Sequence, residues 1–317
     1  SESVRNSKRD EAEDKLIDGA RIAQSIKDEV RDQTAVLLAR HGIAPGLAFM
    51  LVGDDPASRS YVASKEKACA YCGFHSTTLR LPADTPEPDI LAQIDRWNID
   101  PDIHGILVQL PLPSHVDEDR VIEAISPRKD VDGFHPINVG KLVIGQECFL
   151  PCTPAGIQEL IIRSGIETAG RHVVVVGRSN IVGKPIANIL LQKAAGANAV
   201  VTVTHSAAPD IAVYTRQADV LIVATGRVNT ITADMVKDGV AVIDVGINRV
   251  EDATRERGYR LVGDVDFDGV APNASRITPV PGGVGPMTIA MLMKNTLASA
   301  QRSVARGDAG SGHRNGR

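Results

Sequence analysis

A run of four valines, residues 173–176, leads directly into Gly177 and then into Gly183, Lys184 and Pro185. A short continuous apolar run of this kind is typical of a buried parallel strand. A glycine turn between a strand and a helix lets the backbone approach a phosphate, and the free N–H groups of the helix point toward it. The pattern predicts the phosphate turn of a dinucleotide-binding domain, although an ordinary tight turn also fits it.

The spacing of this turn excludes a P-loop. Five residues separate Gly177 from Gly183, where a P-loop has four, and Pro185 stands where a Ser or Thr would bind magnesium. Ser179 replaces the second glycine of the G-x-G-x-x-G fingerprint. A kinase or a ligase is therefore excluded.

Apolar runs alternate with amphipathic segments along the whole chain, which predicts an α/β fold built from βαβ units around parallel sheets. Strands are expected at residues 47–52, 74–81, 105–110, 173–176, 199–204, 220–224, 240–245 and 277–280. Helices are expected at residues 18–41, 57–71, 90–97, 154–164 and 286–302, and a hairpin is one reading of residues 248–266.

We predict two domains, as suits a length of 317 residues. They are an N-terminal α/β catalytic domain (residues 15–153) and a Rossmann-type doubly wound parallel sheet (residues 154–285). Residues 286–303 are expected to form a helix that returns to the N-terminal domain, and residues 1–14 and 306–317 to be disordered tails. A small substrate is expected in the cleft between the two halves.

Composition limits the partners. The formal net charge is -4, which gives no electrostatic reason to expect nucleic acid or an anionic membrane. No stretch approaches the roughly 20 apolar residues that cross a bilayer, and the N-terminus does not resemble a secretory signal. The four cysteines include Cys69 and Cys72, but Cys69 lies in a helical pattern, so buried thiols are favoured over zinc and no metal is predicted. A small number of cysteines in a long chain is typical of a protein in the reducing cytoplasm.

The second strand of the C-terminal half suggests which dinucleotide binds. An NAD site usually has Asp or Glu at the end of this strand, but here His205 and Ser206 follow it. Arg178, with His205 and Ser206, can bind a ribose phosphate, which favours NADP over NAD. The alternative is that Arg178 is a solvated turn residue.

Three further segments fit close approach to a ligand. Gly226 and Ile247 follow predicted strands at their carboxyl ends, where such folds bind ligands, and Ile247 can pack against a flat ring. Residues 279–288 include Pro281, Gly282 and Gly285, and make a rigid backbone with little side-chain bulk.

Four polar residues of the N-terminal half are candidates for the chemistry. Tyr61 and Lys65 share one helix face, Gln109 stands at the end of the third strand, and Asp132 falls in an irregular turn. Taken separately, three of them have an ordinary alternative: Lys65 as a solvated lysine, Gln109 as a residue that caps a strand, and Asp132 as an aspartate required by a turn.

Together these segments resemble the bifunctional methylenetetrahydrofolate dehydrogenase/methenyltetrahydrofolate cyclohydrolases. The segments that carry the resemblance occur in the same order: residues 61–65, 109–113, 129–133, 177–185 and 281–288. The resemblance runs from about residue 16 to residue 302. Both tails lie outside it. The length and the missing P-loop exclude a trifunctional enzyme with a formyl ligase.

The resemblance implies NADP as cofactor, tetrahydrofolate derivatives as substrates, a place in one-carbon metabolism and purine biosynthesis, and a homodimer paired through the cofactor domains. It implies that Lys65 is the key catalytic residue, tuned by Gln109, and that Tyr61 stacks on the folate while Asp132 holds the pterin. By the same resemblance, Arg178, Ser179 and Ser206 bind cofactor phosphates, and the proline–glycine segment lines the folate and nicotinamide pockets.

Two rival functions are weighed against this one. An amino-acid or hydroxy-acid dehydrogenase also joins a small α/β domain to a dinucleotide domain, but it would not need the Tyr61, Lys65, Gln109 and Asp132 set. A non-catalytic folate or nucleotide binder would not need an intact Lys65.

Overall fold

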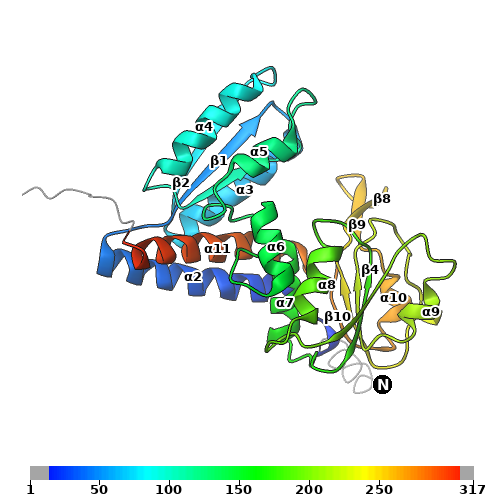
Figure 1. Ribbon diagram of the computed structural model, residues 1–317. Helices are drawn as coiled ribbons and strands as arrows, with labels where there is room; N and C mark the ends of the chain where they lie inside the picture. The colour runs from blue at the N-terminus through cyan, green and yellow to red at the C-terminus, as the bar shows by residue number, and fades with distance from the viewer. Residues whose placement is uncertain (1–13, 308–317) are drawn as a thin grey trace, which may run out of the picture. The chain divides into compact units, whose positions relative to one another are not determined.

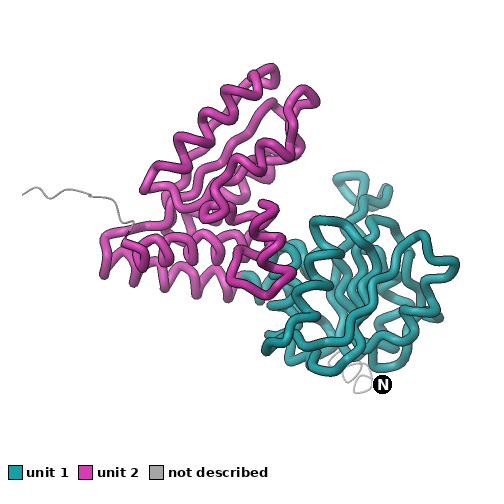
Figure 2. Tube along the Cα trace, in the orientation of Figure 1, with its two compact units in different colours: residues 1–23, 153–288 teal, residues 24–152, 289–317 magenta. Residues whose placement is uncertain are grey.

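The computed structural model describes residues 14–307, which fall into two compact units (Figure 2). Unit 1 comprises the chain up to Ala23 together with Thr153–Thr288, and unit 2 comprises Gln24–Cys152 and the chain from Ile289 onward. The last helix thus belongs mostly with the N-terminal half, as predicted. The domain bounds given above remain a prediction. Apart from Asp14, Arg306 and Gly307, the predicted tails lie outside the described residues.

Unit 2 contains a three-stranded parallel sheet in the order β2-β1-β3 (Figure 1). Its strands are β1 (Gly46–Val52), β2 (His75–Leu81) and β3 (Gly105–Val108). Its helices are α3 (Pro56–Cys72), α4 (Glu87–Ile99), α5 (Glu118–Ala124), α6 (Pro136–Ile144), and the larger parts of α2 (Gly19–His41) and α11 (Gly285–Ala305). The strands and longer helices match the prediction, whereas α5 and α6 were not foreseen.

The core of unit 2 explains why its sheet is stable. All seven residues of β1 are buried, as expected for the central strand of a parallel sheet. Ile90, Ile94 and Trp97 recur along one face of α4 and pack in one cluster with Met50 and Ile106 of the sheet. This cluster fixes the sheet whose carboxyl edge carries Gln109.

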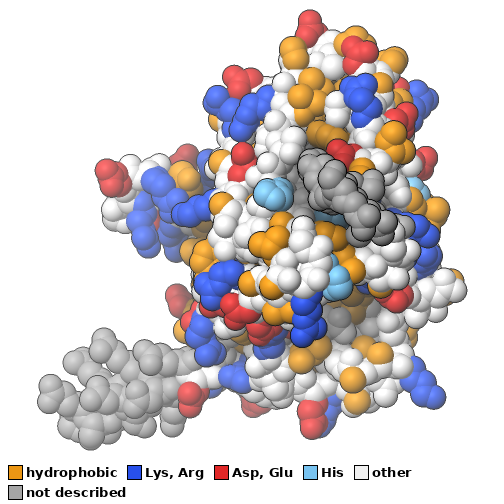
Figure 3. All heavy atoms as spheres, turned by 90° about the vertical axis from the view of Figure 1, so that its left-hand side faces the viewer, with side chains coloured by type: hydrophobic (Ala, Val, Ile, Leu, Met, Phe, Trp, Pro, Cys, Tyr) orange, Lys and Arg blue, Asp and Glu red, His pale blue; other side chains and the backbone are white. Residues whose placement is uncertain are grey.

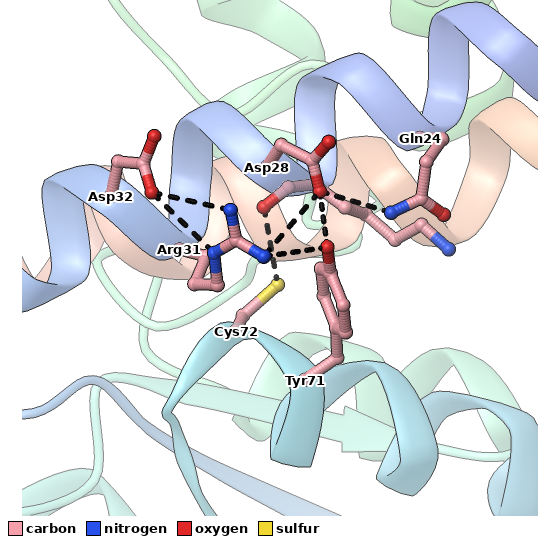
Figure 4. A network of polar contacts seen from close by, with 7 residues as sticks. Gln24, Asp28, Arg31, Asp32, Tyr71 and Cys72 are labelled. Atoms are coloured by element: carbon pink, nitrogen blue, oxygen red, sulfur yellow. Dashed lines mark hydrogen bonds and ion pairs between the residues drawn. The ribbon is translucent and has the colours of Figure 1, made fainter.

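Helix α3, which carries Tyr61 and Lys65, is attached to α2 by a polar network within unit 2 (Figure 4). The Tyr71 hydroxyl donates a hydrogen bond to Asp28, and Arg31 Nη1 donates one of 2.8 Å to the Tyr71 oxygen. Cys72 is buried against the Lys27 carbonyl. These contacts fix the C-terminal end of α3, so they limit how far the helix face that carries Tyr61 and Lys65 can shift.

Unit 1 contains a five-stranded parallel sheet in the order β10-β7-β6-β4-β5. Its strands are β4 (His172–Val176), β5 (Val200–Thr204), β6 (Val220–Val223), β7 (Val240–Asp244) and β10 (Ala274–Ile277). Its helices are α7 (Cys152–Arg163), α8 (Gly183–Leu191), α9 (Ala212–Thr215), η1 (Ala233–Met235) and α10 (Phe267–Val270). The chain reverses its direction of winding between β4 and β6, and such a switch point is where doubly wound sheets bind ligands.

The structure confirms one predicted element of unit 1 and corrects another. Residues 248–266 contain an antiparallel hairpin of β8 (Asn248–Glu251) and β9 (Tyr259–Val262), as one reading of the sequence had it. The strand predicted at residues 277–280 was misplaced, because β10 ends at Ile277. Pro279 and Pro281 have no N–H to donate to a neighbouring strand, so this segment is a loop.

The surface carries mixed charges. On the face drawn in Figure 3, acidic and basic side chains are interspersed, with apolar side chains between them. This distribution agrees with the small net charge of the sequence. Within residues 14–307, no helix combines the length and the apolar character needed to span a membrane.

Candidate functional site

The amine of Lys65 lies against Gln109. Lys65 Nζ donates a hydrogen bond of 2.9 Å to Gln109 Oε1, although 44 residues separate them. Gln109 is buried, and its Nε2 donates to the Leu110 carbonyl at 3.0 Å, which turns the amide oxygen toward the lysine. The Gln109 backbone N–H also continues the sheet by donating to Met50. Gln109 therefore orients the amine from a rigid position.

The turn that carries Asp132 is fixed from three sides. The Ile106 N–H in β3 donates to the Lys129 carbonyl at 2.9 Å. The buried Asp130 carboxylate accepts from the His135 N–H and from Asn138 Nδ2, both at 2.9 Å. On the third side, Nδ2 of Asn295 in α11 donates to the Val131 and Leu150 carbonyls.

Burial and charge together set the protonation of this group. Burial lowers the pKa of Lys65 below its usual 10.5, and the negative charge of Asp132 partly opposes that shift. Burial raises the pKa of Asp132 to about 6, and the Lys65 charge again opposes the shift. Burial thus brings the pKa values of the amine and the carboxyl group closer together, which favours general acid–base catalysis by this group.

Two further residues border this group. Tyr61 lies one turn before Lys65 on α3, and its side chain is 57% exposed, which leaves its ring free to stack on a ligand. Cys152 is buried near Lys65 and Asp132, and its pKa is raised by burial, so its thiol is protonated at neutral pH. Cys152 was not among the residues predicted for the site.

The glycine turn after β4 has the geometry of a phosphate cradle. Gly177 has φ of 123°, and a Cβ there would lie 2.3 Å from the Ala224 carbonyl oxygen. A Cβ on Gly183 would lie 2.4 Å from the Gly177 oxygen. Ser179 Oγ accepts from the N–H groups of Val182 and Gly183, so it stabilises the turn that leads into α8. Only glycine fits at both positions, so the turn is closely packed.

The proposed phosphate-binding side chains meet beside this turn. Arg178 Nη1 lies 3.2 Å from His205 Nε2, although 27 residues separate them. Arg178 and Ser206 are exposed, and His205 is half-buried. A guanidinium beside an imidazole fits the phosphate of an NADP ribose.

Ile247 and the proline–glycine segment line one cavity of about 130 Å³ in unit 1. Its lining includes Gly246, Pro281, Gly282 and Gly285. A Cβ on Gly285 would come within 3.4 Å of the Ile247 side chain. Ile247 is 57% exposed, so it can pack against a planar ligand. Gly226, in the segment that follows β6, forms a turn with φ of 69°.

The cysteines do not form a metal centre in the part of the chain that the structure describes. All four are free thiols, and Cys69 lies within α3, as its helical pattern indicated. No group of three His, Cys, Asp or Glu side chains among residues 14–307 is placed to bind a metal ion.

Comparison with known proteins decides the family. The profile of the tetrahydrofolate dehydrogenase/cyclohydrolase catalytic domain matches residues 17–132, and that of the NAD(P)-binding domain of the same family matches residues 151–304. The chain belongs to the tetrahydrofolate dehydrogenase/cyclohydrolase family. The predicted resemblance, the two-part α/β fold and the nicotinamide dinucleotide domain are thereby confirmed.

Members of this family with known names or structures match nearly end to end. The bifunctional protein FolD of Syntrophus aciditrophicus is 60% identical over 288 residues, which cover 91% of this chain and 98% of that protein. The crystal structure of the FolD methylenetetrahydrofolate dehydrogenase/cyclohydrolase from Campylobacter jejuni is 50% identical, with a TM-score of 0.85 and coverage of 90% and 98%. The Trypanosoma brucei enzyme, solved with NADP and an inhibitor, is 43% identical with a TM-score of 0.84, and the match covers 91% and 98% of the two chains.

Sequence reasoning missed the residues that support the site. Asp130 and Asn295 position the Asp132 turn, and Asp244 and Asp264 are buried below the loops after β6 and β7. A signal was present for Asp244, since a carboxylate that ends an otherwise apolar strand needs buried partners. Asn295 gave no such signal, because its partners lie more than 140 residues away.

Proposed function

We propose that this chain oxidises methylenetetrahydrofolate with NADP and then hydrolyses the product to formyltetrahydrofolate. The observation that carries the proposal is the amine of Lys65, held at 2.9 Å from Gln109 and close to Asp132 in a member of this family. NADP supplies the acceptor for a hydride from the methylene bridge of the folate, which becomes a methenyl cation. Hydride transfer depends on alignment more than on acid–base help.

The second step uses the polar group of unit 2. Water adds its oxygen to the cationic methenyl carbon, and Lys65 removes one proton from that water, which leaves a hydroxyl adduct. One C–N bond of the bridge then breaks as the hydroxyl oxygen becomes the formyl carbonyl, and the proton of that hydroxyl passes to the nitrogen that leaves. Lys65 suits this role because its lowered pKa leaves more of the amine neutral. In this proposal Gln109 orients the amine, Tyr61 stacks on the folate, and Asp132 holds the pterin.

The wild-type chain provides the first test. We expect NADP and methylenetetrahydrofolate to yield NADPH, followed at its absorbance band, and formyltetrahydrofolate, identified by mass spectrometry. If neither the folate nor an amino acid nor a hydroxy acid yields NADPH, only the non-catalytic binder remains. NADPH formed with an amino acid or hydroxy acid, but not with the folate, would favour the rival dehydrogenase.

The cofactor preference is tested at Arg178. We expect Arg178→Ala to weaken NADP binding by about tenfold or more, because a charged hydrogen bond contributes roughly 1.5–3 kcal/mol, and to change NAD binding little. Dissociation constants from fluorescence quenching with the reduced cofactors measure this. Arg171→Ala, an exposed arginine before β4 rather than after it, is the control. Equal losses for both cofactors would contradict a phosphate role for Arg178.

The pH dependence of hydrolysis tests the coupling of Asp132 to Lys65. The neutral fraction of Lys65 rises as pH passes through its pKa, and the Asp132 charge raises that pKa. Asp132→Asn is therefore expected to shift the rising limb of cyclohydrolase kcat to lower pH. Below pH of about 6, where Asp132 is itself protonated, the two profiles should converge. Profiles that coincide throughout would show that Asp132 does not influence the amine.

We also propose that the chain forms a homodimer through its cofactor units. Strand β5 is an edge strand, and Val200 and Val203 on it are 61% and 42% exposed. Exposed apolar edges favour pairing with another copy, and charged side chains oppose it. We expect light scattering to give the mass of a dimer for the wild type and of a monomer for Val200→Lys/Val203→Lys. A monomeric wild type would contradict this proposal.

A further inference from the structure

Two buried carboxylates lie below the cofactor loops of unit 1, and neither has a role in the mechanism above. Asp264 is fully buried, and Asp244 is 4% exposed. A buried carboxylate is costly unless hydrogen-bond donors surround it. The hydrogen-bond donors of these two carboxylates therefore show which parts of the chain the carboxylates fix in place.

Asp264 joins the segments that follow two neighbouring strands. Its Oδ2 accepts from the backbone N–H groups of Thr225 at 2.7 Å and Gly226 at 3.0 Å, and from the Thr225 hydroxyl at 3.1 Å. Its Oδ1 accepts from Asn248 Nδ2 at 2.9 Å. Thr225 and Gly226 follow β6, and Asn248 follows Ile247 in the segment after β7. One carboxylate thus links the turn after β6 to the segment after β7.

Asp244 fixes Asp264 from below. Its carboxylate accepts from the backbone N–H groups of Gly246, Asp264 and Val265 at 2.9–3.1 Å. The two carboxylates are closely surrounded, because a Cβ on Gly246 would lie 2.0 Å from Asp264 Oδ1 and a Cβ on Gly263 would lie 1.8 Å from Asp244 Oδ2. This packing leaves Asp264 one position, with its oxygens aimed at the loops above.

The turn after β6 cannot use two of its backbone amides to bind a ligand. The N–H groups of Thr225 and Gly226 are both occupied by Asp264, so they are not available to a cofactor phosphate. Their contribution to the site is the shape of the turn, in which Gly226 has φ of 69°. Without the carboxylate, the amides of Thr225 and Gly226 would lose their acceptor, and the turn would lose its connection to Asn248 through Asp264.

We propose that Asp264 is a positioning residue for NADP binding, which sets the turn after β6 and the segment after β7 in the conformation that the dinucleotide needs. This inference rests on the proposed function, since it assumes that NADP binds at this edge of the sheet. It assigns the effect to Asp264 although the carboxylate does not itself touch the cofactor.

The test compares Asp264→Ala with Asp264→Asn in the full chain. Asparagine keeps one oxygen for Thr225 and Gly226, and the Asn248 amide can rotate to accept from the new NH2 group. We expect the dissociation constant of NADPH, from fluorescence titration, to rise by about tenfold or more in the alanine variant, a change of ~1.4 kcal/mol. We expect it to rise by no more than about threefold in the asparagine variant. Asp252→Ala in the β8–β9 hairpin is the control.

A second readout separates positioning from general destabilisation. Hydrolysis of supplied methenyltetrahydrofolate without cofactor uses Lys65 in unit 2, so it should persist in Asp264→Ala. If this variant does not fold, amide hydrogen exchange of the wild type without cofactor tests the same point. Protected Thr225 and Gly226 amides are expected, and rapidly exchanging ones would overturn the inference.

The remaining outcomes are equally decisive. An unchanged NADPH dissociation constant in Asp264→Ala would overturn the inference and leave the proposed function intact. Loss of hydrolysis together with NADPH binding in a folded variant would also overturn it, since the role would then be structural. A wild type that binds no NADPH would overturn both.

Discussion

Replacing Lys65 by methionine is expected to lower the cyclohydrolase rate by about 10²- to 10⁴-fold, the range that a positioned general base contributes. Methionine preserves the length and apolar stem of lysine but removes the amine that donates to Gln109. Binding of NADPH should stay within about twofold of the wild type, because the glycine turn and Arg178 lie in unit 1. The measurement is hydrolysis of methenyltetrahydrofolate, corrected for the uncatalysed rate.

Lys67→Met is the matched control for this experiment. Lys67 lies on the same helix but is exposed, so its loss should leave hydrolysis unchanged. Wild-type hydrolysis in purified Lys65→Met would refute the assignment of the base. Loss of NADPH binding in parallel would instead indicate that the substitution disturbs the whole fold.

Replacing Gly177 by alanine is expected to weaken NADPH binding by about 10- to 100-fold. A residue with a side chain at φ of 123° costs roughly 1–3 kcal/mol, and the new Cβ would lie 2.3 Å from the Ala224 oxygen. The turn must therefore move away from the switch point between β4 and β6. Fluorescence titration with NADPH measures the loss, and cyclohydrolase activity reports whether unit 2 is intact.

Gly170→Ala is the control for Gly177→Ala. Gly170 also has a positive φ, of 68°, but a Cβ there would meet nothing within 4 Å. This variant therefore carries backbone strain without a clash at the cofactor turn, and its NADPH binding should be unchanged. If both variants bind NADPH equally well, the cradle at Gly177 does not bind the dinucleotide.

Much of the fold followed from local patterns in the sequence. The buried strands were predictable because continuous apolar runs such as residues 173–176 have few alternative structures. The turn at Gly177 was predictable because glycine is needed where φ is positive. The strand predicted at residues 277–280 was wrong: the apolar residues favoured a strand, but Pro279 and Pro281 cannot donate the backbone hydrogen bonds of a strand. Helices α5 and α6 are short, at seven and nine residues, so their apolar periodicity is brief.

The candidate site was less accessible to sequence reasoning from residues alone. The contact between Lys65 and Gln109 depends on how α3 packs against the sheet, which no local pattern encodes, and only the family resemblance brought these residues together. The role of Asp264 depends on backbone N–H groups nearly 40 residues away, and any residue type can supply such donors. Side chains that bind backbone therefore leave little trace in a single sequence.

The most direct test of the mechanism is the protonation of Lys65 itself. NMR titration of chains with 13C-labelled lysine side chains, with the Lys65 signal identified by its absence in Lys65→Met, would give its midpoint. We expect a midpoint below 10.5, since burial disfavours the charged amine more than Asp132 stabilises it. A midpoint at or above 10.5 would contradict the proposal that Lys65 is the base.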